Sequence, residues 1–119
     1  MNVRTHTVDT VAVISLSGEL DGRSTLDGDQ VLGLIPRQGR ALLDFSDVTY
    51  MNSRSLRIML LVYRHAQASG SQVALVGLSD RLRSILQAVG FLRFFVVADD
   101  IATGVADLLA GSPEASATA

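Results

Sequence analysis

The sequence of 119 residues contains no cysteine and no lysine. Without cysteine, neither a disulfide framework nor a thiolate metal site can form, and the chain gives no reason to expect an oxidising compartment. All ten basic residues are arginine, and twelve acidic residues bring the formal net charge to -2. This balance lacks the concentrated positive field on which nucleic-acid binding relies. We therefore expect a cytoplasmic protein that does not bind DNA or RNA.

Long apolar runs are also missing. Stretches such as Val11–Ile14 are too short to cross a bilayer or to form the core of a signal peptide, so we expect no direct insertion into a membrane. A hydrophobic content of 48% is enough for one core, which predicts a single domain over residues 1–110. Residues 111–119 are small or polar without apolar periodicity, and they are expected to form a flexible tail.

The familiar catalytic patterns are absent as well. No phosphate-binding loop is present, which disfavours nucleotide hydrolysis, and neither His6 nor His65 has carboxylates at a recognisable metal-ligand spacing. Ser53 and His65 share one predicted helix about 18 Å apart, too far for a nucleophile and its base. Glu19 and Asp21 could form an acid/base couple, but their position at a strand end favours ordinary surface acids. We predict no catalytic residue, metal or cofactor, and no enzymatic activity.

What is present is an alternation of strands and helices. Apolar and β-branched runs predict strands at residues 3–8, 11–16, 40–45, 72–77 and 94–97. Helical spacing and capping residues predict helices at residues 24–35, 53–69, 79–90 and 99–109. A two-residue turn at Asp9 and Thr10 would join the first two strands. Because strands separated by helices need crossover connections, we predict an α/β fold with a mixed, mostly parallel sheet, in the order β-β-α-β-α-β-α-β-α.

The segment at residues 53–69 is the clearest helix. An apolar stripe follows helical spacing, and Gly70 stands where a C-terminal cap belongs. The predicted stripe consists of Leu56, Met59, Leu60 and Tyr63. Residues 47–51 are expected to carry the chain from the third strand to this helix, while Ser24 is the expected cap of the preceding helix.

Two segments resemble a known family. Ser17-Gly18-Glu19-Leu20-Asp21 is similar to the Gly-Glu-Leu-Asp element of STAS domains. Residues 44–53, Asp-Phe-Ser-Asp-Val-Thr-Tyr-Met-Asn-Ser, resemble the strand and loop of that family that run into an Asp-Ser-Ser/Thr-Gly-Leu segment at a helix start. Residues 73–77 and 81–90 fit a later strand and helix, so the resemblance covers about residues 5–110. It implies a STAS-like fold.

The resemblance also implies a regulatory function. Bacterial anti-sigma factor antagonists of this family bind an anti-sigma factor that is also a serine kinase, and phosphorylation of the antagonist's serine reverses the binding. By position, Ser53 matches this phosphoacceptor, Asn52 the preceding aspartate, Arg54 the second Ser/Thr and Ser55 the glycine. The expected partner-binding surface consists of Glu19, Asp21, Gly22, Arg23, Asn52, Ser53, Arg54, Ser55 and Arg57.

Elementary electrostatics agrees with a switch at Ser53. A serine in the first turn of a helix presents its hydroxyl outward, and the helix N-terminus together with Arg54 and Arg57 would favour a phosphate there. The roughly -1.5 to -2 charges of a phosphate would oppose docking of a partner by repulsion and desolvation. Phosphorylation would therefore leave the domain folded while weakening its interface.

The departures from the family pattern keep other interpretations open. Asn52 retains a good helix cap but removes a charge, and Ser55 adds a side chain where a partner's backbone would approach. One alternative is a non-phosphorylated STAS scaffold or an accessory subunit of a membrane transporter ATPase. Another is a small-ligand or nucleotide pocket at the carboxyl ends of the parallel strands. The exposed edge of the N-terminal strand is compatible with a monomer or a weak homodimer.

Overall fold

The structure is a computed structural model that describes residues 2–20 and 25–110. Five strands form one sheet: β1 (Asn2–Val8), β2 (Val11–Leu20), β3 (Arg40–Met51), β4 (Gln72–Val76) and β5 (Val96–Ala98). The helices are α1 (Thr25–Leu34), α2 (Ser53–Ser69), α3 (Asp80–Ala88) and α4 (Ile101–Ala110), with a 3₁₀ helix, η1 (Phe91–Phe94), before β5. The expected cap Ser24 and the expected tail at 111–119 lie outside the described residues.

The order of strands and helices confirms the predicted α/β fold. The spatial order of the strands is β1-β2-β3-β4-β5; β1 runs antiparallel to β2, and all the other pairs are parallel. The predicted hairpin is present, because Val8 pairs with Val11 across the two-residue turn. Asp9 in this turn has a φ of 53°, a left-handed conformation that aspartate tolerates in turns.

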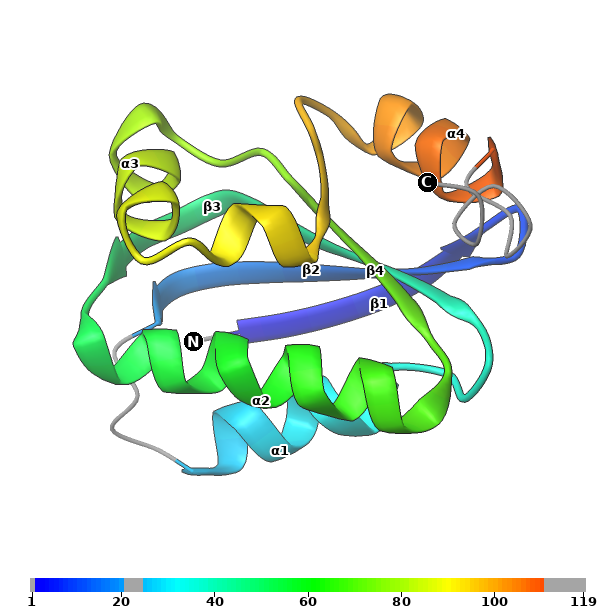
Figure 1. The fold of residues 1–119 in the computed structure, drawn as a ribbon, viewed down its shortest axis with the longest axis horizontal. Coiled ribbons are helices and arrows are strands. Elements are labelled where there is room, and N and C mark those ends of the chain that lie inside the picture. Colours follow the sequence, from blue (N-terminus) through cyan, green and yellow to red (C-terminus); the bar gives the residue numbers. More distant parts are fainter. Residues whose placement is uncertain (1, 21–24, 111–119) are drawn as a thin grey trace.

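Alternating side chains divide the core between the two faces of the sheet. Leu43 of β3 packs in a cluster with residues of α1, α2 and α3, whereas its neighbour Leu42 packs in a second cluster with Val105 and Leu108 of α4. Figure 1 shows α4 on the side of the sheet opposite to α1 and α2. Both faces of the central strands are therefore covered, which explains why these strands are almost continuously apolar.

The strands β2 and β3 are longer than predicted. The second strand was expected to stop at Ser17 and Gly18, and residues 47–51 were expected to form a connection. Instead both strands continue and pair up to Leu20 and Met51, with register shifts on either side of Gly18. Gly18 has a φ of 91°, so glycine permits the irregularity that carries the strand onward instead of ending it.

The last predicted strand also needs correction. Residues 94–97 were expected to be extended, but Phe94 ends η1 and the strand begins at Val96. The ring of Phe94 stacks on Tyr63 of α2 with centroids 4.5 Å apart. This contact holds the chain against α2 before it turns into the sheet, which shortens β5.

The buried face of α2 is rotated relative to the predicted stripe. Met59 is buried as expected, whereas Leu56, Leu60 and Tyr63 are only partly buried. The fully buried positions of the helix are Ser55, Ile58, Met59, Val62 and Ala66. The predicted stripe omitted Ile58 and Val62, and the small residues Ser55 and Ala66 share the buried face with them.

Asp100 precedes α4 and caps it. Its carboxylate accepts a hydrogen bond from the backbone N–H of Thr103, with N and O 2.7 Å apart. This bond, together with one from the Thr103 side chain, lowers the pKa of Asp100 below its ordinary value of 3.8. The negative charge also lies at the favourable end of the helix dipole, as expected for the carboxylates that begin this helix.

Candidate functional site

The start of α2 is fixed by a reciprocal capping box. Asn52 has extended backbone dihedrals, and its side-chain oxygen accepts hydrogen bonds from the N–H groups of Arg54 and Ser55 at 3.0 and 3.1 Å. In return, the hydroxyl of Ser55 accepts from the backbone N–H of Asn52 at 2.6 Å and donates to the Asn52 carbonyl at 2.7 Å. The predicted cap at Asn52 is thereby confirmed, and the helix start is held rigidly.

Ser55 does not lie on the surface where the sequence analysis placed it. Its exposed fraction is 0%, and its hydroxyl is engaged in the capping box with Asn52. The side chain therefore points into the domain and cannot obstruct the approach of a partner's backbone. The spacing of Asn52 and Ser55 was the available signal, because a polar residue three positions after an N-cap is typical of a capping box.

Three neighbouring side chains face solvent. Ser53 is the first residue of α2 and is exposed, as are Arg54 and Arg57. Within the described part of the chain, the Ser53 hydroxyl has no hydrogen-bond partner. A free hydroxyl at a helix N-terminus, beside two guanidinium groups, is a favourable position for an added phosphate.

The sheet brings Glu19 close to this helix start. Glu19 and Leu20 of β2 pair in register with Tyr50 and Met51 of β3, and Asn52 follows directly. Glu19 is exposed, and its register partner Tyr50 is 42% exposed. Tyr50 was not among the predicted site residues, although an aromatic residue beside a predicted binding segment is the kind of side chain that interfaces favour. Two distant motifs thus meet at the carboxyl ends of β2 and β3.

Asp21, Gly22 and Arg23, also expected on the partner surface, lie outside the described residues. In the sequence, Asp21 comes directly after Leu20, the last residue of β2.

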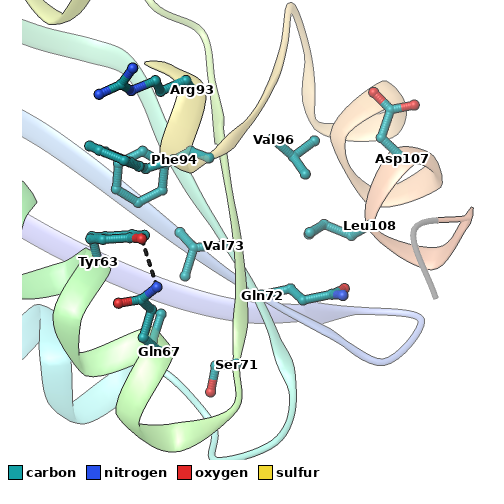
Figure 2. A pocket seen from close by; sticks show the side chains of 12 residues that line it. Tyr63, Gln67, Ser71, Gln72, Val73, Arg93, Phe94, Val96, Asp107 and Leu108 are labelled. Carbon is teal, nitrogen blue, oxygen red and sulfur yellow. Dashed lines mark hydrogen bonds between the residues drawn. The ribbon is translucent and has the colours of Figure 1, made fainter. Parts of the chain in front are cut away.

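A separate cavity of about 380 Å³ lies elsewhere in the molecule. Figure 2 shows Tyr63 and Gln67 of α2 on one side of it, Asp107 of α4 on the other, and Phe94 from η1 at its upper rim. Gln72 and Val96, the first residues of β4 and β5, also line it. The cavity is thus at the amino ends of these strands, not at the carboxyl ends, where a ligand pocket was expected.

A nucleophile–base pair, a metal-binding cluster and a membrane-spanning helix are three further arrangements that bear on function. Ser53 and His65 lie on the same helix, twelve residues or about 18 Å apart, so they cannot act as a nucleophile–base pair. No group of three histidine, aspartate or glutamate residues suited to a metal ion is found in residues 2–20 and 25–110. Across the same residues, no helix combines the length and apolar character needed to span a bilayer.

Comparison with known families identifies the fold. The family model described as "Mlab, STAS domain" matches residues 3–98. The chain belongs to the STAS domain family.

Individual relatives extend this result. BtrV of Bordetella bronchiseptica, named as a candidate anti-sigma factor antagonist, is 24% identical over 101 residues, covering 83% of this chain and 87% of BtrV. A candidate anti-sigma factor antagonist of Thermotoga maritima superposes with a TM-score of 0.80 at 22% identity, over 90% of this chain and 94% of that one. The murine anion transporter Slc26a9 contains a similar domain, with a TM-score of 0.76 at 15% identity over 88% of this chain and 18% of the transporter.

Proposed function

We propose that this protein is a cytoplasmic anti-sigma factor antagonist, which binds an anti-sigma factor/serine kinase and is released when Ser53 is phosphorylated. It acts by binding, without catalysing a reaction itself, as a monomer or weak homodimer. The observation that carries the proposal is the exposed hydroxyl of Ser53 at the first position of the capped helix α2, beside exposed Arg54 and Arg57. The similarity to two candidate anti-sigma factor antagonists supports it.

The proposed partner surface combines the end of β2 with the start of α2. Glu19 and Tyr50 contribute from the strand ends, and Asn52, Ser53, Arg54 and Arg57 from the helix start. Asp21, Gly22 and Arg23 belong to the same proposed surface because they follow β2. Ser55 supports it from within by fixing the conformation of Asn52. Because the capping box keeps the helix start ordered in the free protein, little conformational entropy is lost when a partner binds.

The switch is a phosphoryl transfer between the bound proteins. The partner transfers the γ-phosphoryl group of ATP to Ser53 Oγ: the new O–P bond forms, the bond to the leaving ADP breaks, and the hydroxyl proton passes to a base of the kinase or to water. The dianionic product is compatible with the helix N-terminus, so the domain stays folded. At the interface, the added charge must be desolvated and repels acidic groups of the partner, which favours dissociation.

A phosphorylation assay tests this function. The purified protein is incubated with its cognate anti-sigma factor kinase and ATP, and incorporation is measured by intact mass spectrometry. We expect one phosphate on the wild type and none on Ser53→Ala. Ser84→Ala, which removes another exposed serine from α3, is the matched control and should retain the phosphate. Persistent incorporation in Ser53→Ala would remove Ser53 from this role.

A second candidate keeps the fold but not the switch. The similarity to a domain of an anion transporter, together with Asn52 and Arg54 at positions where the antagonist pattern has other residues, favours a constitutive scaffold or an accessory subunit of a membrane transporter ATPase. Such a subunit would bind its transporter through the same surface and acquire no phosphate. The phosphorylation assay therefore separates the two functions, and copurification with a membrane ATPase would support the second.

A further inference from the structure

The outer face of α2 carries a row of arginines beyond the site described above. Four residues of this face are exposed: Arg54, Arg57, Leu61 and Arg64. The exposed fraction of Leu61 is 43%. At 3.6 residues per turn, these four positions fall within a sector of about 80° on the side of the helix opposite to Ser55, Met59 and Ala66. Ser53 lies at the border of the same sector. We refer to Arg54, Arg57, Leu61 and Arg64 as the arginine face.

The arginine face has no evident role within the domain. α2 contains no acidic residue, so none of its arginines has a carboxylate one turn away on the same helix. No salt bridge joins Arg54, Arg57 or Arg64 to another described residue. Among the described residues, an ion pair instead links Arg83 and Asp99 at 3.6 Å, away from α2. An arginine in the first turn also opposes the helix dipole. Internal stability therefore does not explain this arrangement.

The length and composition of the arginine face suit contact with a helix of another protein. From Arg54 to Arg64 the helix advances about 15 Å, close to three turns. An exposed leucine between arginines resembles the composition of interface centres, in which apolar contacts and arginine are enriched. Figure 1 shows α2 along the outside of the molecule over its full length, with α1 at its side. A helix of similar length could therefore lie along it.

We propose that the arginine face binds an acidic helix of the anti-sigma factor kinase, with Leu61 packing against an apolar residue of that helix. This inference rests on the proposed function and extends its interface from the start of α2 to the third turn. The charge of the occupant follows from complementarity: three guanidinium groups without an ion-pair partner among the described residues favour carboxylates opposite them. A single exposed leucine is too little apolar surface for membrane insertion, and a net charge of -2 disfavours nucleic acid.

The position of Ser53 links this face to the switch. In a helix, residues four positions apart are neighbours, so Arg57 lies within reach of a phosphate on Ser53, and Arg54 is adjacent in the chain. A dianionic phosphate would pair with these guanidinium groups in charge-assisted hydrogen bonds. Phosphorylation then neutralises the part of the arginine face nearest to Ser53, in addition to repelling the partner. Arg64, about two turns further along, remains outside this effect.

Binding of the purified cognate kinase, measured by calorimetry at several salt concentrations, tests the inference. The variant Arg57→Gln/Arg64→Gln should bind about tenfold more weakly than the wild type and show a smaller salt dependence. Leu61→Ala should also weaken binding. Arg4→Gln is the matched control: Arg4 is exposed on β1, far in sequence from α2. Circular dichroism establishes that each variant is folded.

The outcomes separate the two proposals. If the wild type binds the kinase and the double variant binds equally well, the arginine face is not part of the interface, while the proposed function stands. If the wild type does not bind the kinase, both fail. Anionic phosphatidylserine vesicles and a DNA duplex serve as further probes. Binding of either probe that is lost in the double variant, with kinase binding unchanged, would assign the arginine face to that ligand and overturn the inference.

Discussion

Residues 52 to 55 perform different tasks although they are nearly consecutive. Asn52 and Ser55 exchange hydrogen bonds that fix the backbone, whereas Ser53 and Arg54 face solvent. The residues that hold the helix start are thus distinct from those available to a partner. A rigid support beneath exposed polar groups is typical of preorganised binding sites, in which little ordering remains to be done on association.

Replacing Ser55 by alanine should weaken the fold. The variant loses the hydrogen bond from the Asn52 N–H and the bond to the Asn52 carbonyl, leaving a partly buried donor without its partner. We expect the free energy of unfolding to fall by about 1–2 kcal/mol, measured by urea denaturation. Ser53→Ala, at an exposed position in the same turn, should change it by no more than about 0.5 kcal/mol. Equal stability of the two variants would contradict the structural role of Ser55.

The cap at Asn52 could be predicted from sequence, but the burial of Ser55 was missed. Asparagine between an apolar strand and a helical pattern is a local signal, which needs only the preference of its side chain for the first free N–H groups. The orientation of Ser55 depends on which side of α2 meets the sheet. That orientation is set by packing with other elements, and the predicted stripe was rotated by about one residue from the face that α2 buries.

At the scale of elements, the approach of α4 to the sheet depends on a glycine. Gly104 is buried, and a Cβ atom added there would come within 2.7 Å of both Leu42 Cδ1 and Val76 Cγ1. These side chains belong to the second core cluster, which α4 covers. The absence of a side chain at this position lets the helix backbone rest directly on β3 and β4. Arg40 also anchors this helix, since its side chain donates to the Leu108 carbonyl at 3.0 Å.

Gly104→Ala tests this close packing, with Gly33→Ala as the matched control. Both glycines are in helices, but nothing lies within 4 Å of a Cβ atom added at Gly33. We expect Gly104→Ala to lower the free energy of unfolding by about 1–3 kcal/mol through overpacking. Gly33→Ala should raise it by about 0.5–1 kcal/mol, because alanine is the better helix former. Stabilisation by both substitutions in thermal or urea unfolding would mean that α4 is not closely packed.

The type and order of the elements followed from sequence because hydrophobic period and capping signals are local. Their lengths depended on tertiary pairing. The ends of β2 and β3 form strands because they lie beside each other, although residues 47–51 alone do not have the pattern of a buried strand. In the same way, stacking of Phe94 on Tyr63 decides where β5 begins. Neither contact could be found from segments considered one at a time.

In the whole molecule, the proposed partner surface and the cavity are at different ends of the sheet. Glu19, Tyr50 and the start of α2 lie at the carboxyl ends of β2 and β3, whereas the cavity lies at the amino ends of β4 and β5. The helix start at Ser53 and the cavity are therefore separate regions of the molecule. The motifs predicted the first of these regions because they lie in the chain segments that form it. The cavity, by contrast, is assembled from α2, η1, α4 and the first residues of β4 and β5, with no motif of its own.

The central claim is that negative charge at Ser53 releases a bound anti-sigma factor kinase, and binding of that kinase to wild type, Ser53→Ala and Ser53→Glu tests it most directly. A glutamate in the first turn favours the helix dipole, so the variant should remain folded and any loss of binding would report on the interface. We predict similar dissociation constants for wild type and Ser53→Ala, and binding at least about tenfold weaker for Ser53→Glu. Equal binding by all three proteins, or none by the wild type, would contradict the claim.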